Sequence, residues 1–148
     1  MKLAILAAAV LAPIMFALPA GSAQDRGITV TSLEAILKKN LRSGGGTAAI
    51  VATIPAGDTG MGILVMSKNR LYHHDRQDHV LYLVRGSGTA RLENASGKIE
   101  TRPIKPGDIL ELPRGKKHGF EKTGDQDLVF LVVSAPGSDA PEDTVFDE

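Results

Sequence analysis

The sequence predicts an all-β fold, a barrel or sandwich of short strands with one short helix before it. Between Thr47 and Ser134, short apolar runs alternate with breaks rich in Gly, Pro, Asn and Asp. Many short strands at regular spacing are typical of β-barrels and β-sandwiches. Helical spacing of apolar residues marks a short segment before this region. Together the two patterns predict a small β-fold with a helical lead-in.

Residues 1–23 are predicted to be a signal peptide that is removed. Lys2 precedes an apolar run from Leu3 to Leu18, and small residues lead up to Ala23. A basic start, an apolar core and a small-residue cleavage site are typical of secretory signals. The run is at the short end of what a membrane-spanning helix needs, and no basic stop-transfer residues follow it. We therefore expect a periplasmic or secreted protein without a stable membrane anchor.

Residues 24–46 are predicted to form a short helix and a linker. Thr31 and Glu34 fit a capping box, in which Glu34 reaches back to the amide of Thr31. Apolar residues then recur on one helical face, at Leu33, Ile36, Leu37 and Leu41. The glycine-rich segment after Ser43 ends the helix and lets the chain turn.

Residues 47–134 are predicted to form the barrel. The expected strands are Ala48–Ile54, Met61–Met66, Val80–Val84, Thr89–Glu93, Lys98–Arg102, Asp108–Leu112, His118–Glu121 and Leu128–Val133. Two of them, Val80–Val84 and Leu128–Val133, are apolar on both faces, so their outer face needs a cover. Either the helix or a second subunit supplies it, and we expect a homodimer.

Residues 135–148 are predicted to be a disordered acidic tail. They hold five acidic residues and two prolines, with only Val145 and Phe146 as sizeable apolar side chains. Such a segment buries too little apolar surface to offset the entropy of ordering it.

Charge and cysteine content exclude several classes of partner and site. Seventeen basic side chains balance 17 acidic ones, and no polybasic stretch stands out. Nucleic acid is therefore not an expected partner. The chain has no cysteine, so disulfides and thiolate ligands are excluded. A metal would have to be held by imidazole, carboxylate or tyrosine.

The four histidines lie in two clusters at the start of strand-like runs. Successive side chains of a strand alternate faces, so Tyr72 and His74 share one face and His73 points the other way. His79 would face the interior on the next strand, and His118 would do the same on its own. The imidazoles can therefore converge inside a β-barrel.

The two clusters resemble the two motifs of the cupin superfamily. The second motif is matched without a gap by Gly107, Pro113, Gly115 and His118. Lys122 stands where asparagine is usual in that family. In the first motif Gly86 matches, which sets His79 at the usual glutamate position, His74 at the second histidine and Tyr72 at the first.

The resemblance implies a cupin-type jelly-roll β-barrel and a metal site inside it. Its alignment and the strand alternation together predict His74, His79 and His118 as the metal ligands. A register shifted by one residue stays open, in which His73 and Asp75 face inward with His79. Each histidine also has a plain alternative as an ordinary buried or surface polar residue, and His73 is expected to be one.

Three imidazoles would hold a divalent transition metal (Fe, Zn, Mn, Ni or Cu) without offsetting its charge. Such a site should favour anionic ligands and lower the pKa of bound water. Tyr72, beside the open coordination position, is the candidate catalytic residue. It would donate a proton, orient a ligand or bind the metal, and the plain alternative is that it packs in the barrel mouth.

The expected function is that of an exported metal-binding cupin acting on a small, anionic molecule. The resemblance implies a dioxygenase-, isomerase- or lyase-like metalloenzyme. The alternative is a non-catalytic cupin of the cell envelope that binds a metal or small ligand, because few acid or base groups besides Tyr72 and Glu111 are at hand. A sensor domain of a transcription regulator fits poorly with an export signal.

Overall fold

The structure is a computed structural model that describes residues 28–39, 47–56, 59–136 and 143–147. The predicted signal peptide, residues 1–23, lies outside the described residues. Chain contacts separate Met1–Val30 from Thr31–Glu148, and every helix and strand described belongs to the second unit. Within the described ranges, no helix has the length and apolar character needed to cross a membrane.

One helix and ten strands make up the described part of the second unit. In chain order they are α1 (Leu33–Lys39), β1 (Ala48–Ala56), β2 (Thr59–Met66), β3 (Tyr72–His74), β4 (Asp78–Arg85), β5 (Gly88–Glu93), β6 (Ile99–Ile104), β7 (Ile109–Leu112), β8 (His118–Lys122), β9 (Leu128–Ala135) and β10 (Thr144–Phe146). The all-β class with one short helix is confirmed.

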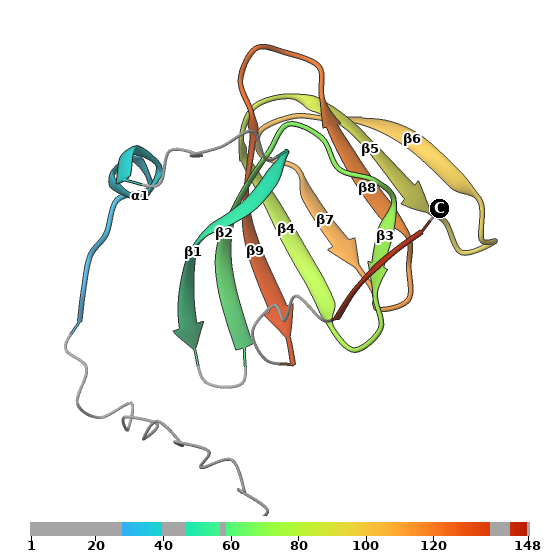
Figure 1. The fold of residues 1–148 in the computed structure, drawn as a ribbon, viewed down its shortest axis with the longest axis horizontal. Coiled ribbons are helices and arrows are strands. Elements are labelled where there is room, and N and C mark those ends of the chain that lie inside the picture. The colour runs from blue at the N-terminus through green and yellow to red at the C-terminus, as the bar shows by residue number, and fades with distance from the viewer. Residues whose placement is uncertain (1–27, 40–46, 57–58, 137–142, 148) are drawn as a thin grey trace, which may run out of the picture. The chain divides into compact units, whose positions relative to one another are not determined.

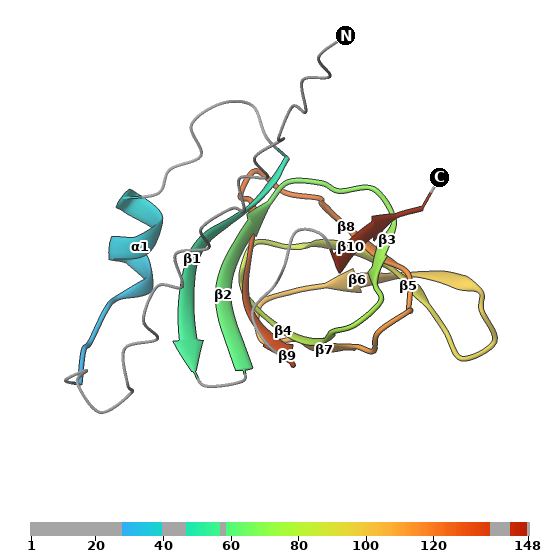
Figure 2. The same cartoon turned by 60° about the horizontal axis from the view of Figure 1, so that its bottom comes forward.

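The strands form two antiparallel sheets that enclose a common interior (Figure 1). One sheet has the order β1-β2-β9-β4-β7 and the other β10-β3-β8-β5-β6. In each sheet a late strand lies between early ones, β9 between β2 and β4, and β8 between β3 and β5. This crossing-over is the arrangement of a double-sheet jelly roll. Seen after a 60° turn, the two sheets curve around one interior (Figure 2).

The interior is filled by side chains that point inward at every second position along the strands. On β4 burial alternates, so that Leu81 and Leu83 are buried while Val80 and Tyr82 are exposed. Phe120 and Phe130 meet across the two sheets with ring centroids 5.2 Å apart, and both are fully buried. Burying each such side chain contributes roughly 1.5–3 kcal/mol. This apolar floor supports the histidine-bearing end of the barrel.

Helix α1 covers the outer face of β2 and β9. Its apolar residues Leu33, Ile36 and Leu37 pack on a small cluster that includes Val129. The helix thus supplies part of the cover that the two-faced strand Leu128–Val133 required. The expected capping box is wrong in its details, because the side-chain oxygen of Ser32 accepts the hydrogen bond from the amide of Ala35 at 3.1 Å.

Glu34 makes a different contact from the one that the capping box predicts. Its carboxylate accepts a hydrogen bond from Nη2 of Arg85 at the end of β4. A long-range ion pair to the barrel replaces the expected local bond to the start of the helix. Tertiary contacts often override such local preferences.

The prediction of a disordered tail is wrong for residues 143–147. Strand β10 pairs antiparallel with β3, with Thr144 opposite His74 and Phe146 opposite Tyr72. Composition alone predicted disorder. The segment is ordered because its backbone pairs with the edge strand β3 and because Arg76 and Lys117 pair with Asp143 and Asp147. Residues 137–142 and 148 lie outside the described residues.

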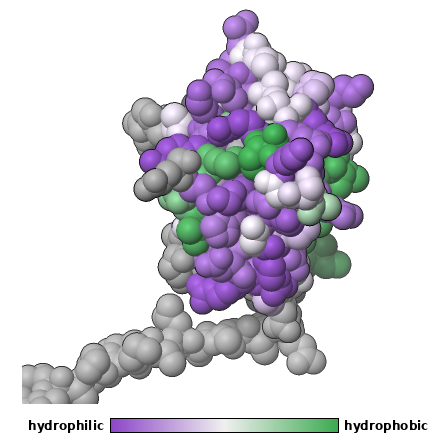
Figure 3. All heavy atoms as spheres, turned by 90° about the vertical axis from the view of Figure 1, so that its right-hand side faces the viewer, coloured by the Kyte–Doolittle hydropathy of each residue, from purple (hydrophilic) through white to green (hydrophobic). Residues whose placement is uncertain are grey.

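The side of the molecule that carries the β5–β6 hairpin is mainly hydrophilic, with a narrow hydrophobic band across it (Figure 3). The hairpin alternates polar side chains with less polar ones, and Ile99 is the half-exposed apolar residue of β6. This face is suited to solvent.

Candidate functional site

Three of the four histidines converge inside the barrel from three different strands. His74 ends β3, His79 is the second residue of β4 and His118 begins β8, and their exposed fractions are 4%, 4% and 2%. The ring centroid of His74 lies 4.0 Å from that of His79 and 5.7 Å from that of His118. The sequence thus predicted which imidazoles come together.

His73 points away from this group. Its Nδ1 lies 3.1 Å from Oδ2 of Asp147 and its Nε2 lies 3.2 Å from Oδ1 of Asp75. Asp75 is largely exposed. The structure therefore adopts the register with His74 inward, and the register in which His73 and Asp75 face the interior is not the one observed.

A cavity of about 210 Å³ opens beside His74 and His79. It is lined by Ala48, Ala49, Ile50, Leu64, Met66, Asn69, Tyr72, His74, His79, Leu81, Val132, Thr144 and Phe146. Tyr72 stands against it with its ring 4.3 Å from that of His118 and 5.3 Å from that of His74. The chamber is apolar with a few polar groups at one end, which is the usual character of a small-molecule site.

His118 lines a second cavity and not the first. The second cavity, of about 200 Å³, is lined by His118 together with charged side chains of the opposite rim, among them Glu93, Lys116 and Lys117. Glu93 accepts hydrogen bonds from Lys116 Nζ and from the amide of Lys117, both at 3.2 Å. These bonds and the lysine charges lower the pKa of Glu93, so the rim of this cavity holds a fixed carboxylate.

Burial keeps two of the interior histidines, His79 and His118, neutral. Burial, followed by the neighbouring imidazoles of His74 and His118, lowers the pKa of His79 from 6.5 to about 4. Burial likewise lowers the pKa of His118 to about 4. Near pH 7 both rings are uncharged, which is the state in which imidazole binds a metal.

The tautomer of His118 is set by its backbone partner. Nδ1 lies 2.9 Å from the carbonyl oxygen of Lys116. A carbonyl only accepts, so Nδ1 carries the proton and Nε2 carries the lone pair. Nε2 is buried and has no hydrogen-bond partner among the described residues. A buried acceptor of this kind is an available metal ligand.

The donor set suits a transition metal, although the side chains are not arranged around one point. Within the described ranges, no group of three or more His, Asp or Glu side chains could hold a metal ion as it stands. Metal–nitrogen distances near 2.1 Å would require the rings to shift. The fit therefore rests on chemistry: neutral buried imidazoles and the unpartnered Nε2 of His118.

A salt bridge fixes the two motifs to each other. The carboxylate of Asp78, next to His79, accepts hydrogen bonds from the amide, Nε and Nη2 of Arg114 at 2.8, 3.1 and 2.7 Å. Hydrogen bonding to Arg114 lowers the pKa of Asp78 to about 2. The next turn residue, Gly115, has a φ of +74° and donates its amide to the carbonyl of His74 at 2.7 Å. The turn before His118 is thus joined to the strand ends that carry His74 and His79.

Two other motif positions have roles that the structure makes plain. Gly86 has a φ of +82°, and a Cβ there would lie 2.4 Å from the carbonyl oxygen of Asp127. Only glycine fits this close approach. Lys122, which replaces the usual asparagine, pairs with Asp127 at 3.3 Å. Glu111 is exposed on β7 and lines the second cavity, not the one beside His74 and His79.

Sequence reasoning missed two acidic residues beside the site, Asp143 and Asp147, which flank β10. Asp143 is 2% exposed, and Asp147 has a side chain that is 14% exposed. They were missed because the tail was predicted to be disordered. The β-branched and aromatic triplet Thr144–Phe146 between them was the available signal, but it is too short to predict a strand.

Comparison with protein families identifies the domain. Residues 64–134 match the family described as "Cupin domain". This segment is thus similar to that family. It contains Tyr72, His74, His79 and His118, so the resemblance inferred from the two motifs is confirmed at the level of the domain.

Solved structures share the cupin architecture. A conserved protein with a double-stranded beta-helix domain from Klebsiella pneumoniae is 17% identical, covers 82% of this chain and 99% of its own, and superposes with a TM-score of 0.62. Bacillus subtilis oxalate decarboxylase, in a study of its Mn(II) centers, is 19% identical over 76% of this chain and 31% of its own, with a TM-score of 0.55. At these identities the likeness shows the fold.

Among curated proteins, acireductone dioxygenase of Bacillus cereus is 32% identical over 61 residues. The match covers 41% of this chain and 36% of the relative. The chain thus matches only about a third of the length of this enzyme.

Proposed function

We propose that this protein is a metal-binding cupin in which His74, His79 and His118 hold a divalent transition metal for chemistry on a small molecule. The observation that carries the proposal is the convergence of three buried imidazoles from three strands, two of which, His74 and His79, line an apolar cavity. Burying a polar side chain in a barrel core lowers the stability of the fold unless the side chain is hydrogen-bonded or binds a metal. The matches to a dioxygenase and to a decarboxylase with Mn(II) centers support the same class.

The size and lining of the cavity support a small molecule as the substrate. A chamber of about 210 Å³ with mostly apolar walls admits a small molecule. A divalent ion would supply Lewis-acid chemistry there, and redox chemistry if it is a redox-active metal. We propose a small chelating anion, such as an enolisable dicarbonyl, with a dioxygenase-, isomerase- or lyase-like reaction.

The residues of this chain would divide the remaining work between them. The phenol of Tyr72, close to His118 and His74, is placed to donate a proton to a bound ligand or to orient it. Phe146 and Leu81 line the apolar walls, which exclude water from the ligand.

Metal analysis of the full chain tests the proposal. After incubation with Mn, Fe, Ni, Cu or Zn and removal of excess metal, we expect about one equivalent of at least one of them per chain. His74→Ala and His118→Ala should each retain less than about a tenth of an equivalent, while His73→Ala, the matched neighbour outside the cavity, should keep it. Retention below a tenth of an equivalent by the wild type would overturn the proposal.

A non-catalytic binding protein is the second candidate. The observation that favours it is the cavity lining, in which the described residues include Tyr72 and two histidines but neither Asp nor Glu. A steady-state assay with dicarbonyl and sugar-acid substrates separates the two. Turnover that depends on added metal and falls in Tyr72→Phe would support the enzyme, and metal binding without turnover would support the binding protein.

We also propose that the protein is exported and forms a homodimer. The basic, apolar and small-residue pattern of residues 1–23 supports export. N-terminal sequencing of the protein from a periplasmic or secreted fraction should find residue 24 first, and an intact N-terminus in the cytoplasm would contradict export. The exposed apolar residues Val80, Tyr82 and Ile109 on the outer face of β4 and β7 support a dimer.

A further inference from the structure

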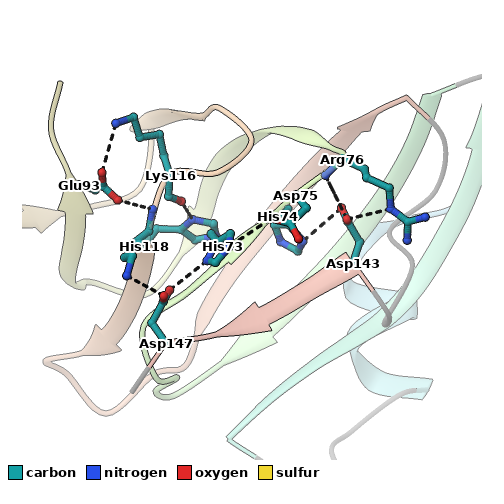
Figure 4. A network of polar contacts seen from close by, with 10 residues as sticks. His73, His74, Asp75, Arg76, Glu93, Lys116, His118, Asp143 and Asp147 are labelled. Carbon is teal, nitrogen blue, oxygen red and sulfur yellow. Dashed lines mark hydrogen bonds and ion pairs between the residues drawn. The ribbon is translucent and has the colours of Figure 1, made fainter. Parts of the chain in front are cut away.

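Asp143 is a buried carboxylate beside one of the three histidines. Its oxygens accept hydrogen bonds from the amide of Arg76 at 3.1 and 3.4 Å and from Nε of Arg76 at 3.2 Å. Its Oδ2 also lies 3.9 Å from Nδ1 of His74 (Figure 4). This separation is longer than a hydrogen bond, so the contact with the imidazole is electrostatic. Arg76 thus holds a carboxylate against His74.

The carboxylate is ionised where it stands. Arg76 donates to the carboxylate from both its amide and its cationic guanidinium, and both hydrogen bonds favour the charged form of Asp143. A negative charge next to Nδ1 of His74 favours the tautomer with the proton on Nδ1. The lone pair then resides on Nε2. Carboxylates that orient metal-binding histidines in this way are common outside the ligand sphere.

We infer that Asp143 is a positioning residue that holds His74 in the tautomer whose Nε2 binds the metal. The inference rests on the proposed function, since it concerns how His74 acts as a ligand. It assigns a role at the site to a residue that lies after the barrel strands in sequence and reaches His74 only through the pairing of β10 with β3.

The same carboxylate alters the charge balance of the site. His79 stands where cupins usually have a glutamate, which predicted a centre with no negative charge of its own. Asp143 supplies one negative charge close to the site without being a ligand, because it contacts His74 from behind. The site would then keep three neutral ligands while the field on its ion is partly offset.

Asp147 is a matched control at the other end of β10. Its carboxylate contacts Nδ1 of His73 at 3.1 Å and Nζ of Lys117 at 2.7 Å. Both aspartates therefore tie β10 to the barrel through a basic partner, but His73 is outside the cavity. Asp147→Asn loosens the strand without changing the charge next to His74.

Manganese affinity of the full chain, measured by competition with a chelator, is the first test. Asp143→Asn should weaken Mn(II) binding by roughly 10–100-fold, the usual effect of losing such a partner. Asp147→Asn should change it by less than about 3-fold, and Asp143→Glu should restore part of the loss. Thermal unfolding of the metal-free variants reports how much each substitution loosens the fold.

The tautomer of His74 in the metal-free protein is the second test. Two-bond ¹H–¹⁵N correlation spectra should show the proton of His74 on Nδ1 in the wild type. In Asp143→Asn the negative charge that favours a proton on Nδ1 is gone, so the tautomer with the proton on Nε2 should gain population. Asp147→Asn should leave the spectrum of His74 as in the wild type. A purely structural role of Asp143 would not move this signal.

The outcomes separate the inference from the proposed function. Equal loss of affinity in Asp143→Asn and Asp147→Asn, with an unchanged tautomer, would overturn the positioning role while the metal site stands. A wild type that binds no manganese or other transition metal would overturn the proposed function, and this role with it.

Discussion

Individual residues of the site were predictable where strand alternation decides their direction. Tyr72, His74, His79 and His118 all face the interior as expected, because alternate side chains of a strand share a face. The contacts that set their chemistry were not predictable. The carbonyl of Lys116 that fixes the tautomer of His118, and the carboxylate of Asp143 behind His74, come from turns and from a strand paired across the sequence.

The buried histidines predict that the metal-free protein loses stability as pH falls from about 6.5 to about 4. The pKa values of His79 and His118 are about 4 in the folded protein and near 6.5 in the unfolded chain. In this window the unfolded chain binds more protons, so acid favours unfolding. The loss is on the order of 3 kcal/mol for each histidine.

Urea unfolding of the metal-free protein between pH 4 and pH 8 measures this loss. His79→Gln should have a shallower dependence on pH than the wild type, because one of the two titrating groups is gone. A stability that stays constant, or that rises toward pH 4, would contradict neutral buried imidazoles.

At the scale of elements, all eight expected strands are present, with ends within two residues of those expected. Period-2 alternation and turn residues suffice for this. The two short strands β3 and β10 did not appear in the expected set, since three residues carry too little pattern to predict a strand. Helix α1 was expected from its apolar spacing. The contact of Glu34 near its start was not, because that side chain bonds to Arg85 of the barrel and not to the helix itself.

The turn after β4 yields a prediction about glycine. Gly86 and Gly97 both have φ near +80°, but a Cβ at Gly86 would meet the Asp127 carbonyl at 2.4 Å, whereas at Gly97 the nearest atom lies at 3.9 Å. Gly97→Ala should cost about 1 kcal/mol of unfolding free energy, from backbone strain alone. Gly86→Ala should cost about 3 kcal/mol or more, because backbone must also move.

Chemical denaturation of the two alanine variants measures the difference between them. Equal losses in Gly86→Ala and Gly97→Ala would mean that the close approach of β4 to the β8–β9 loop contributes nothing beyond the positive φ.

At the scale of the whole molecule, the fold class was predictable and the strand order came only with the resemblance to cupins. Strand patterns alone do not specify that β9 inserts between β2 and β4. Such pairings join residues far apart in sequence, and local patterns carry no record of them. The sequence left open whether the helix or a second subunit covers the two-faced strands. Helix α1 packs against β1 and on the outer-face cluster of β2 and β9, while Val80 and Tyr82 of β4 stay exposed.

The uncovered part of that sheet predicts a dimer. Val80, Tyr82 and Ile109 have exposed fractions of 42%, 42% and 69%, and Tyr82 and Ile109 are cross-strand partners on β4 and the edge strand β7. Contiguous apolar side chains on an edge favour association. Light scattering should give twice the mass of one chain for the wild type and the mass of one chain for Ile109→Glu.

Ile99→Glu is the matched control for the dimer, because Ile99 is 42% exposed on β6 of the other sheet. It should leave the mass unchanged. A wild type that scatters as a single chain at high concentration would contradict association through β4 and β7.

The pairing of β10 with β3 also has a consequence for the order of events in folding. The hydrogen bonds between Asp143 and Arg76 close a separation of 67 residues. Closing so long a loop is entropically unfavourable until the intervening strands have formed. The carboxylate of Asp143 is therefore expected to reach His74 after the barrel strands that hold the three imidazoles have formed. Until β10 docks, the site would have its imidazoles but not the charge behind His74.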